Sequence, residues 1–338
     1  MHPFELTRAL IDIESISENE KQVGEYLLHY LSGLAARTGG KAEAMTVTPE
    51  RFNVYAEWGT PVVALSTHMD TVPPFVISRE DEEYIHGRGA CDAKGIIAAM
   101  IAAAEKLLSD GTRNFALLFV VGEERNSAGA EAAARSPRGT RYLINGEPTE
   151  SKVALGSKGI LRYEIVASGK MAHSAYPDLG ESAIEKLLHA LQAILKIPLP
   201  HDSVLGSTTV NIGTIAGGRA PNIIPDAAKA EVAIRIVGDD REVDRAVRGA
   251  VGNLAEVKEI LTLPAMHFAA LDGLPTSVVA FTTDIPVLVP AWGEPFLFGP
   301  GSIHVAHTTD EKISKRELLA AVDTYASMTQ MLLQRAGA

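Results

Sequence analysis

The sequence VVALSTHMDTV, residues 62–72, decides the expected fold because a short apolar run passes directly into polar residues. The apolar part is bounded by polar residues on both sides, which is typical of a strand buried on both faces. His68 and Asp70 follow at a spacing of two, so an extended chain would direct both side chains to the same side. This pattern predicts a buried strand with a chemically active end.

Three further segments repeat this arrangement of an apolar run followed by histidine or carboxylate. They are FALLFVV (115–121) before Glu123 and Glu124, RYLIN (141–145) before Glu147, and PFLFG (295–299) before His304 and His307. Between them, DAKGIIAAMIAAAEKLL (92–108) predicts an apolar helix with Asp92 as its N-cap. The alternation of strand and helix signals predicts an α/β fold with a mainly parallel sheet.

The middle of the chain has a different pattern. Three segments with partial alternation suggest strands with one solvated face, and an amphipathic helix lies between the first two. The strand segments are ILRYEIVASG (160–169), STTVNIGTIAGG (207–218) and AKAEVAIRIV (228–237). We therefore expect a smaller α+β domain at residues 158–265, inserted into a larger domain that comprises 1–157 and 266–338.

Two capping boxes predict where helices begin. Ser17 with Glu20 precedes an apolar stretch at helical spacing, and Ser314 with Glu317 begins the last helix.

Composition excludes several classes of function. The 338 residues carry a formal net charge of -11, which argues against binding to nucleic acid. No apolar run is long enough to span a membrane, and the N-terminus lacks the basic start and apolar stretch of a signal peptide, so a cytoplasmic location is expected. Cys91 is the only cysteine, so neither an intramolecular disulfide nor a cysteine-based zinc site can form.

The polar residues that follow the strands predict one shared site. The carboxyl ends of parallel strands line a single crevice, and Asp92, after the Gly87–Gly89 loop, can join it. So many carboxylates without a matching Lys or Arg cluster repel one another unless a cation is present. Each residue alone has a plainer interpretation, such as a hydrogen-bonded histidine, a solvated Glu pair or a helix cap. Their coincidence at four strand ends favours a metal site of the kind that suits Zn²⁺, Co²⁺ or Mn²⁺ better than Ca²⁺.

Five motifs, in this order, resemble a known family over nearly the whole chain. They are STHMDTVP (66–73), GRGACDAKG (87–95), VVGEERNSAG (120–129), INGEPTE (144–150) and GPGSIHVAHTTDE (299–311). The resemblance is to the co-catalytic zinc aminoacylase and carboxypeptidase family, which includes acetylornithine deacetylase, succinyl-diaminopimelate desuccinylase, acetyl-lysine deacetylases and glutamate carboxypeptidases. It implies two divalent metal ions, zinc by expectation with cobalt or manganese as alternatives, and a lid role for the inserted domain.

The resemblance implies a ligand role for five residues. His68 and Glu147 would bind one metal ion, Glu124 and His307 the other, and Asp92 would bridge both. His307 fits the family's Ala-His-Thr pattern, so His304 would be only a neighbour in the same loop.

Two further roles follow from the same resemblance. Asp70 would fix the tautomer of the His68 imidazole. Glu123 would be the general base that accepts a proton from the attacking water and passes it to the leaving amine.

The inserted domain supplies four more candidates. His173, in GKMAHSAYP, matches the family histidine that reaches a neighbouring subunit's active site to stabilise the oxyanion, which implies a homodimer through this domain. Asn222 matches a loop that touches substrate. Arg235 lies in an apolar strand, where its charge needs either a substrate carboxylate or a structural salt bridge. Lys158 is a weaker candidate, and Ser157 before it disfavours a succinyl substrate.

The substrate is expected to be a small N-acyl amino acid or short peptide, with deacylation preferred and a dipeptidase or carboxypeptidase as the alternative. A nucleotide-binding oxidoreductase is disfavoured, because Asp92 occupies the third glycine position of the dinucleotide fingerprint. Gly-x-Ser-x-Gly and HExxH are both absent, which disfavours a serine hydrolase and a mononuclear zincin. A catalytically silent metal-binding protein is disfavoured because Glu123, needed only for turnover, is present.

Overall fold

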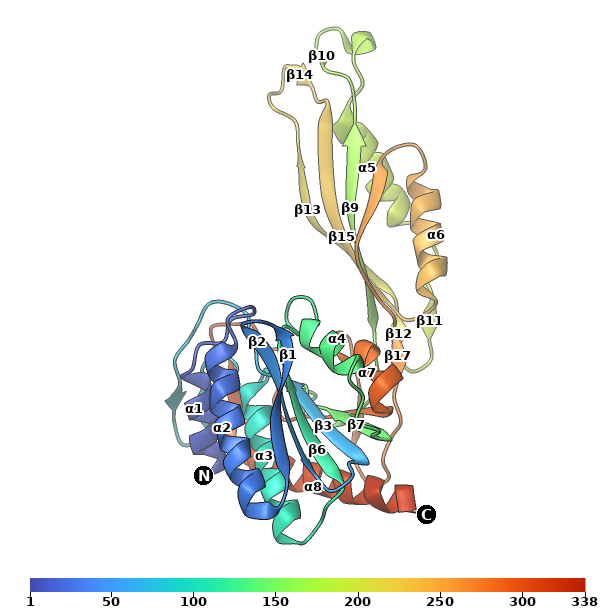
Figure 1. Ribbon diagram of the computed structural model, residues 1–338. Coiled ribbons are helices and arrows are strands. Elements are labelled where there is room, and N and C mark those ends of the chain that lie inside the picture. Colours follow the sequence, from blue (N-terminus) through green and yellow to red (C-terminus); the bar gives the residue numbers. More distant parts are fainter. Residues whose placement is uncertain (338) are drawn as a thin grey trace. The chain divides into compact units, whose positions relative to one another are not determined.

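The computed structural model describes residues 1–337, and the chain divides into two compact units (Figure 1). Unit 1 comprises Met1–Leu155, Phe268–Ser277 and the chain from Thr283 onward. Unit 2 comprises Gly156–His267 and Val278–Thr282. A lid and dimerisation role for the middle of the chain stays a prediction.

Unit 1 is a mixed α/β structure built on a mainly parallel central sheet, as predicted. In spatial order its strands are β1 (Lys41–Thr48), β2 (Arg51–Trp58), β6 (Phe115–Val120), β3 (Val63–His68), β7 (Tyr142–Asn145), β19 (Glu294–Leu297) and the start of β8 (Val153–Ser157), with which β18 (Thr276–Val279) pairs. The four central strands β6, β3, β7 and β19 are mutually parallel, while β1, β2 and β8 are antiparallel to their neighbours. A smaller sheet contains β4 (Arg79–Glu80), β5 (Tyr84–His86) and β20 (Lys312–Ser314).

The strand register brings the ends of the four parallel strands to one edge. His68, the last residue of β3, is opposite Val120 at the end of β6. Asn145, the last residue of β7, is opposite Leu297 at the end of β19. The segments that leave these strands therefore start side by side.

Helices cover both faces of this sheet (Figure 1). One face packs against α1 (Pro3–Ile11), α2 (Lys21–Thr38), α3 (Lys94–Ser109) and α8 (Lys315–Gly337), and the other against α4 (Ala128–Ala134) and α7 (Ile285–Trp292). Successive side chains of β6 point to opposite faces of the sheet. Phe115, Leu117 and Phe119 pack on the face that α3 covers, whereas Ala116 and the other alternate residues of the strand pack on the face that α4 covers.

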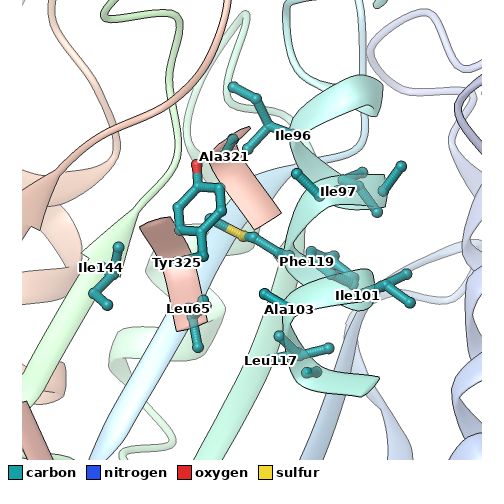
Figure 2. Packing of buried hydrophobic residues seen from close by; sticks show 14 of the residues in the cluster. Leu65, Ile96, Ile97, Ile101, Ala103, Leu117, Phe119, Ile144, Ala321 and Tyr325 are labelled. Carbon is teal, nitrogen blue, oxygen red and sulfur yellow. The ribbon is translucent and has the colours of Figure 1, made fainter. Parts of the chain in front are cut away.

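The apolar helix α3 lies at the centre of the larger core. Figure 2 shows Ile97 and Ile101 of this helix packed near Leu117 and Phe119 of β6, with Tyr325 of α8 nearby. These side chains are all buried, and burying each aliphatic one contributes roughly 1.5–3 kcal/mol. This core fixes the start of α3, and with it the loop that carries Asp92.

Unit 2 is a four-stranded antiparallel sheet covered on one face by two helices. The sheet order is β13 (Thr209–Gly217), β15 (Ala227–Ile236), β9 (Gly159–Ser168) and β16 (Glu256–Leu263), and the helices are α5 (Ala183–Ile194) and α6 (Asp240–Val251). Short pairings join β10 (Ala172–His173) to β14 (Ile223–Ile224) and β11 (His201–Asp202) to β12 (Gly206–Ser207). The remaining elements are the 3₁₀ turn at Pro177–Leu179 and β17 (Met266–His267). Side chains of β15 alternate between buried and exposed, as its sequence pattern predicts.

Helix starts differ from two of the sequence expectations. Asp92 is not the N-cap of α3, since Ala93 occupies that position without a side-chain cap bond. Ser17 does not cap α2, because Glu20 is the N-cap and the Ser17 hydroxyl instead donates to Asp70 Oδ2 at 2.7 Å. Ser314 accepts a hydrogen bond from the Glu317 amide just before α8, which confirms where the last helix begins. The capping box itself is only half formed, because the Glu317 carboxylate accepts from the Gly301 amide. Within residues 1–337, no helix has the length and apolar character needed to cross a membrane.

Candidate metal centre

Parallel strands and one helix start deliver the predicted side chains to a single cluster within unit 1. His68 ends β3, Glu123 and Glu124 follow β6, Glu147 follows β7, His307 lies in the segment after β19, and Asp92 precedes α3. Because these strands are parallel and in register, their polar continuations converge without any need for sequence proximity.

Asp92 is at the centre of this cluster. Its Oδ1 lies 3.0 Å from His68 Nε2, and its Oδ2 lies 3.2 Å from His307 Nε2. The same His307 nitrogen is 2.9 Å from Glu124 Oε1, and His68 Nε2 is 3.9 Å from Glu147 Oε2. One potential ligand atom from each of His68, Asp92 and Glu124 lies within 4.8 Å of the others. The geometry thus places Asp92 between two groups, each of which contains an imidazole and a glutamate.

The turn after β6 is shaped for the Glu123–Glu124 pair. Gly122 has φ of 78°, and a Cβ there would lie 2.7 Å from a guanidinium nitrogen of Arg51, so only glycine fits without displacement. Asn53 accepts a hydrogen bond from the Val121 amide at 3.2 Å and donates to the Gly129 carbonyl at 2.8 Å. The turn is therefore held on both sides of the two glutamates.

His307, and not His304, is brought to Asp92 and Glu124. The backbone of His307 is left-handed, with φ of 64°, a conformation that costs a residue other than glycine roughly 1–2 kcal/mol. His304 is exposed, and its main-chain amide donates to the Ser302 hydroxyl. Strained backbone at a position that aims a side chain into a cluster is typical of functional sites.

Asp70 is buried behind the cluster, and its role in fixing the His68 tautomer stays a prediction. His68 Nδ1 is 3.0 Å from the main-chain carbonyl oxygen of Asp70 and 3.6 Å from the carboxylate, so the carbonyl is the hydrogen-bond partner. The carboxylate accepts hydrogen bonds from the amides of Glu123 at 3.1 Å and Glu124 at 3.3 Å, and from the Ser17 hydroxyl. Asp70 therefore joins the strand that carries His68 to the turn that carries the two glutamates.

Without a cation, the buried carboxylates of the cluster repel one another, and this shifts the pKa values of the groups in it. Burial and the charge of neighbouring Glu147 raise the pKa of Glu123 well above its usual range. Burial likewise raises the pKa of Glu147, which also faces the Asp92 charge. Hydrogen bonds to Asp92 and Glu124 raise the pKa of His307 to about 10. Burial lowers the pKa of His68, but the carboxylates of Asp70 and Asp92 overcome this and raise it well above normal.

The residues present fit divalent cations. Glu147 Oε1 is buried and has no hydrogen-bond partner among the described residues, so this acceptor lacks compensation within the protein. Carboxylate and imidazole donors form the mixed set that suits zinc, cobalt or manganese. A cation would neutralise the mutual repulsion that raises the carboxylate pKa values.

Two residues near the cluster were not predicted to support the metal site. Ser17 was expected to cap a helix, yet it holds Asp70. Asp284 lies at the start of α7, is 1% exposed, and burial raises its pKa to about 6. No sequence pattern distinguishes either residue from ordinary surface polar residues, because only the folded sheet brings them near Asp70 and the cluster.

Unit 2 carries the other candidates. His173 is exposed on β10, opposite Ile223 of β14, and the Ser174 amide donates to the Asn222 carbonyl at 3.0 Å. His173 and Asn222 therefore belong to one pair of adjoining loops. Arg235 Nη1 is buried without a hydrogen-bond partner in residues 1–337, and burial lowers its pKa. Lys158 donates to the Ser207 carbonyl at 2.6 Å.

Comparison with known proteins supports the family expected from the motifs. The model of peptidase family M20/M25/M40 matches residues 64–331. The chain belongs to this family. An M20 domain-containing protein of Schizosaccharomyces pombe is 39% identical over 97% of this chain and 84% of its own length. A protein of Aspergillus oryzae named "Probable carboxypeptidase" is 38% identical over 97% of this M20 chain and 87% of its own.

Solved structures share the fold of this M20 chain. Aminopeptidase PepT of Bacillus cereus matches with a TM-score of 0.80 and 21% identity over 98% of each chain. A metallo-carboxypeptidase of Sulfolobus solfataricus matches with a TM-score of 0.78 and 17% identity, over 98% of this chain and 99% of its own. Membership of the peptidase family, together with relatives named as carboxypeptidases, makes this M20 protein a metal-dependent hydrolase of the peptidase class. The acylase subfamily that the motifs predict is narrower than this class of hydrolase, and it stays a prediction.

Proposed function

We propose that this M20 protein uses two divalent metal ions to hydrolyse the amide bond that joins an acyl or peptidyl group to an amino acid with a free carboxylate. The central placement of Asp92 carries this proposal, because each of its carboxylate oxygens faces a different imidazole. His68, Glu147 and Asp92 would hold one ion, and His307, Glu124 and Asp92 the other. Two such ions, when bound, supply Lewis-acid polarisation of the scissile carbonyl and a more acidic water.

Glu123 is the proposed general base. Burial raises the pKa of its carboxyl group, which suits a group that must accept a proton from water and then donate it to the leaving amine. Its neighbour Glu124 is already within 2.9 Å of His307, whereas no ligand role is assigned to Glu123. Two adjacent glutamates with different surroundings can thus divide proton transfer from metal binding.

Unit 2 supplies the proposed substrate contacts. Arg235 has a buried guanidinium nitrogen without a protein partner in the described chain, and a substrate carboxylate would satisfy it. Asn222 would contact the substrate backbone from the loop beside His173. His173 Nδ1 accepts a hydrogen bond from the Ala175 amide at 3.1 Å, which leaves Nε2 as the donor for an oxyanion.

The group on the carbonyl side of the scissile amide bond distinguishes two candidate substrates. A relative named "Probable carboxypeptidase" supports cleavage of a C-terminal residue from a dipeptide or short peptide. The ordered motifs from STHMDTVP to GPGSIHVAHTTDE support deacylation of an N-acyl amino acid, with acetyl preferred over succinyl because Ser157 precedes Lys158. Both reactions release an α-amino acid, so both use the same bond geometry.

A substrate panel tests the proposal. Zinc-loaded protein is assayed with N-acetyl amino acids, N-succinyl amino acids and dipeptides, and release of free amine is measured against Glu123→Gln as the matched control. Turnover of a dipeptide or N-acyl amino acid that the control lacks supports amide hydrolysis. Metal binding without turnover of any panel member supports the silent alternative.

A further inference from the structure

A buried ion pair lies next to Asp92 and has no part in the proposed proton transfer. Arg88 Nη1 donates to Glu311 Oε2 at 2.6 Å, and each side chain is 2% exposed. Arg88 comes from the glycine loop before α3, and Glu311 comes from the segment just before β20. The pair therefore joins two segments that are far apart in the sequence.

The second oxygen of Glu311 reaches the backbone that carries Asp92. Glu311 Oε1 accepts hydrogen bonds from the main-chain amides of Asp92 at 3.2 Å and Cys91 at 3.3 Å. The main-chain carbonyl of Glu311 also accepts from the Gly87 amide at 3.1 Å. Glu311 is thus attached to both ends of the loop that runs from Gly87 to Asp92.

Arg88 in turn is fixed by the surrounding backbone. Its Nε donates to the Pro74 carbonyl at 3.3 Å, and its amide donates to the Val76 carbonyl at 3.0 Å. Because both Glu311 oxygens are occupied by donors, the carboxylate has little freedom to rotate.

This arrangement sets the distance between two side chains of the cluster. Glu311 lies four residues after His307 on the same segment, and it holds the Asp92 amide while His307 faces the Asp92 carboxylate. A buried ion pair usually adds little to the stability of a fold, since apolar residues of similar volume often stabilise the fold equally well. A carboxylate that accepts three donors from the other segment is better suited to orientation.

We propose that Glu311, held by Arg88, is a positioning residue that fixes Asp92 relative to His307 and so sets the geometry of the metal centre. The inference rests on the proposed metal-binding function. Groups that orient metal ligands from behind typically change metal affinity or activity by 10–100-fold when altered. Loss of this attachment should therefore alter the coordination itself and not only the stability of the fold.

The test uses Co²⁺, whose visible absorption depends on coordination geometry, as the probe. In Glu311→Gln the size is kept, but the single remaining carbonyl oxygen cannot serve both Arg88 and the two amides. Metal-free full-length wild type and variant are titrated with Co²⁺ against a competing chelator, and the spectra are recorded. We expect affinity at least about tenfold weaker and an altered Co²⁺ spectrum in the variant.

A control separates geometry from general destabilisation. Leu107→Ala removes a buried side chain at the far end of α3, and it should lower the Tm without touching the cluster. It is expected to keep the wild-type Co²⁺ spectrum and affinity. Should Glu311→Gln not fold, Glu311→Asp keeps the charge opposite Arg88 but is too short to reach all its donors, and the same change in Co²⁺ binding is expected.

The outcomes distinguish this inference from the proposed function. If wild type binds Co²⁺ and the folded Glu311 variant shows the wild-type spectrum and affinity, Glu311 does not position the centre. If wild type binds no Co²⁺, the metal site and this inference both fail.

Discussion

His68 Nε2 lies 3.0 Å from Asp92 Oδ1, although the two residues come from different elements and are 24 positions apart. The other oxygen of Asp92 faces His307, so one carboxylate separates two imidazoles. This relationship suits a carboxylate shared between two cations, and the predictions below depend on it.

Glu123→Gln should abolish turnover while leaving metal content unchanged. The amide cannot accept a proton from water, and loss of general acid–base catalysis typically costs roughly 10²–10⁴-fold in rate. Steady-state kinetics with elemental analysis of the same sample measure both quantities. Metal loss in this variant would mean that Glu123 is a ligand and not the base.

Glu124→Gln, its adjacent control, should behave in the opposite way. Glu124 Oε1 contacts His307, so its loss removes a proposed ligand and should weaken retention of one ion during dialysis. Full metal retention with lost turnover would exchange the roles assigned to the two glutamates.

Asp70→Asn should impair the site more than Ser17→Ala does. Asparagine places an NH₂ donor where the Asp70 carboxylate accepts amides from Glu123 and Glu124, and a 10–100-fold loss of activity or metal affinity is expected. Ser17→Ala removes one hydroxyl donor, with an expected cost of about 1 kcal/mol in unfolding free energy. Chemical denaturation and metal titration of both variants check the order, and equal metal affinity in the two would contradict it.

The metal-free protein should lose stability as the pH rises above neutral. Asp92 and Glu124 raise the pKa of His307 from 6.5 to about 10 in the folded state. Such a group stabilises the fold fully below its unfolded pKa, and that contribution disappears as the pH passes through the folded value. Thermal scans between about pH 6.5 and about pH 10 should show a falling Tm without metal. Zinc-loaded protein should show a smaller fall, since a bound cation replaces the proton. A metal-free Tm that rises over this range would contradict the assignment.

A twofold dimer through unit 2 is expected to complete each active site with His173 of the other subunit. Strand β13 lies at the edge of the sheet in unit 2 and is largely exposed, so it can pair across a symmetry axis. His173→Ala and Glu123→Ala should each be inactive alone.

Reassorting these two variants at equal amounts tests the arrangement. About half of the dimers would be mixed, and each mixed dimer would have one complete site, which gives roughly a quarter of wild-type activity. If mass measurement shows mixed dimers while the sample stays inactive, His173 does not act across subunits.

The parallel strands could be predicted because each is a short apolar run followed at once by polar residues. Every residue of β3 and β6 is buried, and the apolar residues at the start of β3 and throughout β6 indicate where these strands lie. The convergence of His68, Glu147 and His307 then follows from the rule that parallel strands end at one edge. The fold and the membership of the cluster were accessible for this reason.

Contacts between distant segments that do not follow from the ends of parallel strands could not be predicted. The sequence placed Asp92 in the cluster, but the helix-cap role that its position also suggested was wrong, because its side chain faces two histidines and Ala93 is the N-cap. The Ser17 hydroxyl bonds to Asp70, which is 53 positions away in the sequence, and the Glu311 carboxylate bonds to the Asp92 amide, which is 219 positions away. No local sequence pattern encodes contacts at such separations. Helix α7 was missed because it is short and contains Pro286 and Pro290, residues that normally argue against a helix.

Metal stoichiometry tests the central claim most directly. Metal-free protein is reconstituted with excess zinc, freed of unbound metal, and measured by elemental analysis together with amide hydrolysis. Two ions per chain are expected, with activity lost on chelation and restored on adding metal back. A ceiling of one ion would contradict the shared role of Asp92, and a chain that retains none would contradict the metal centre itself.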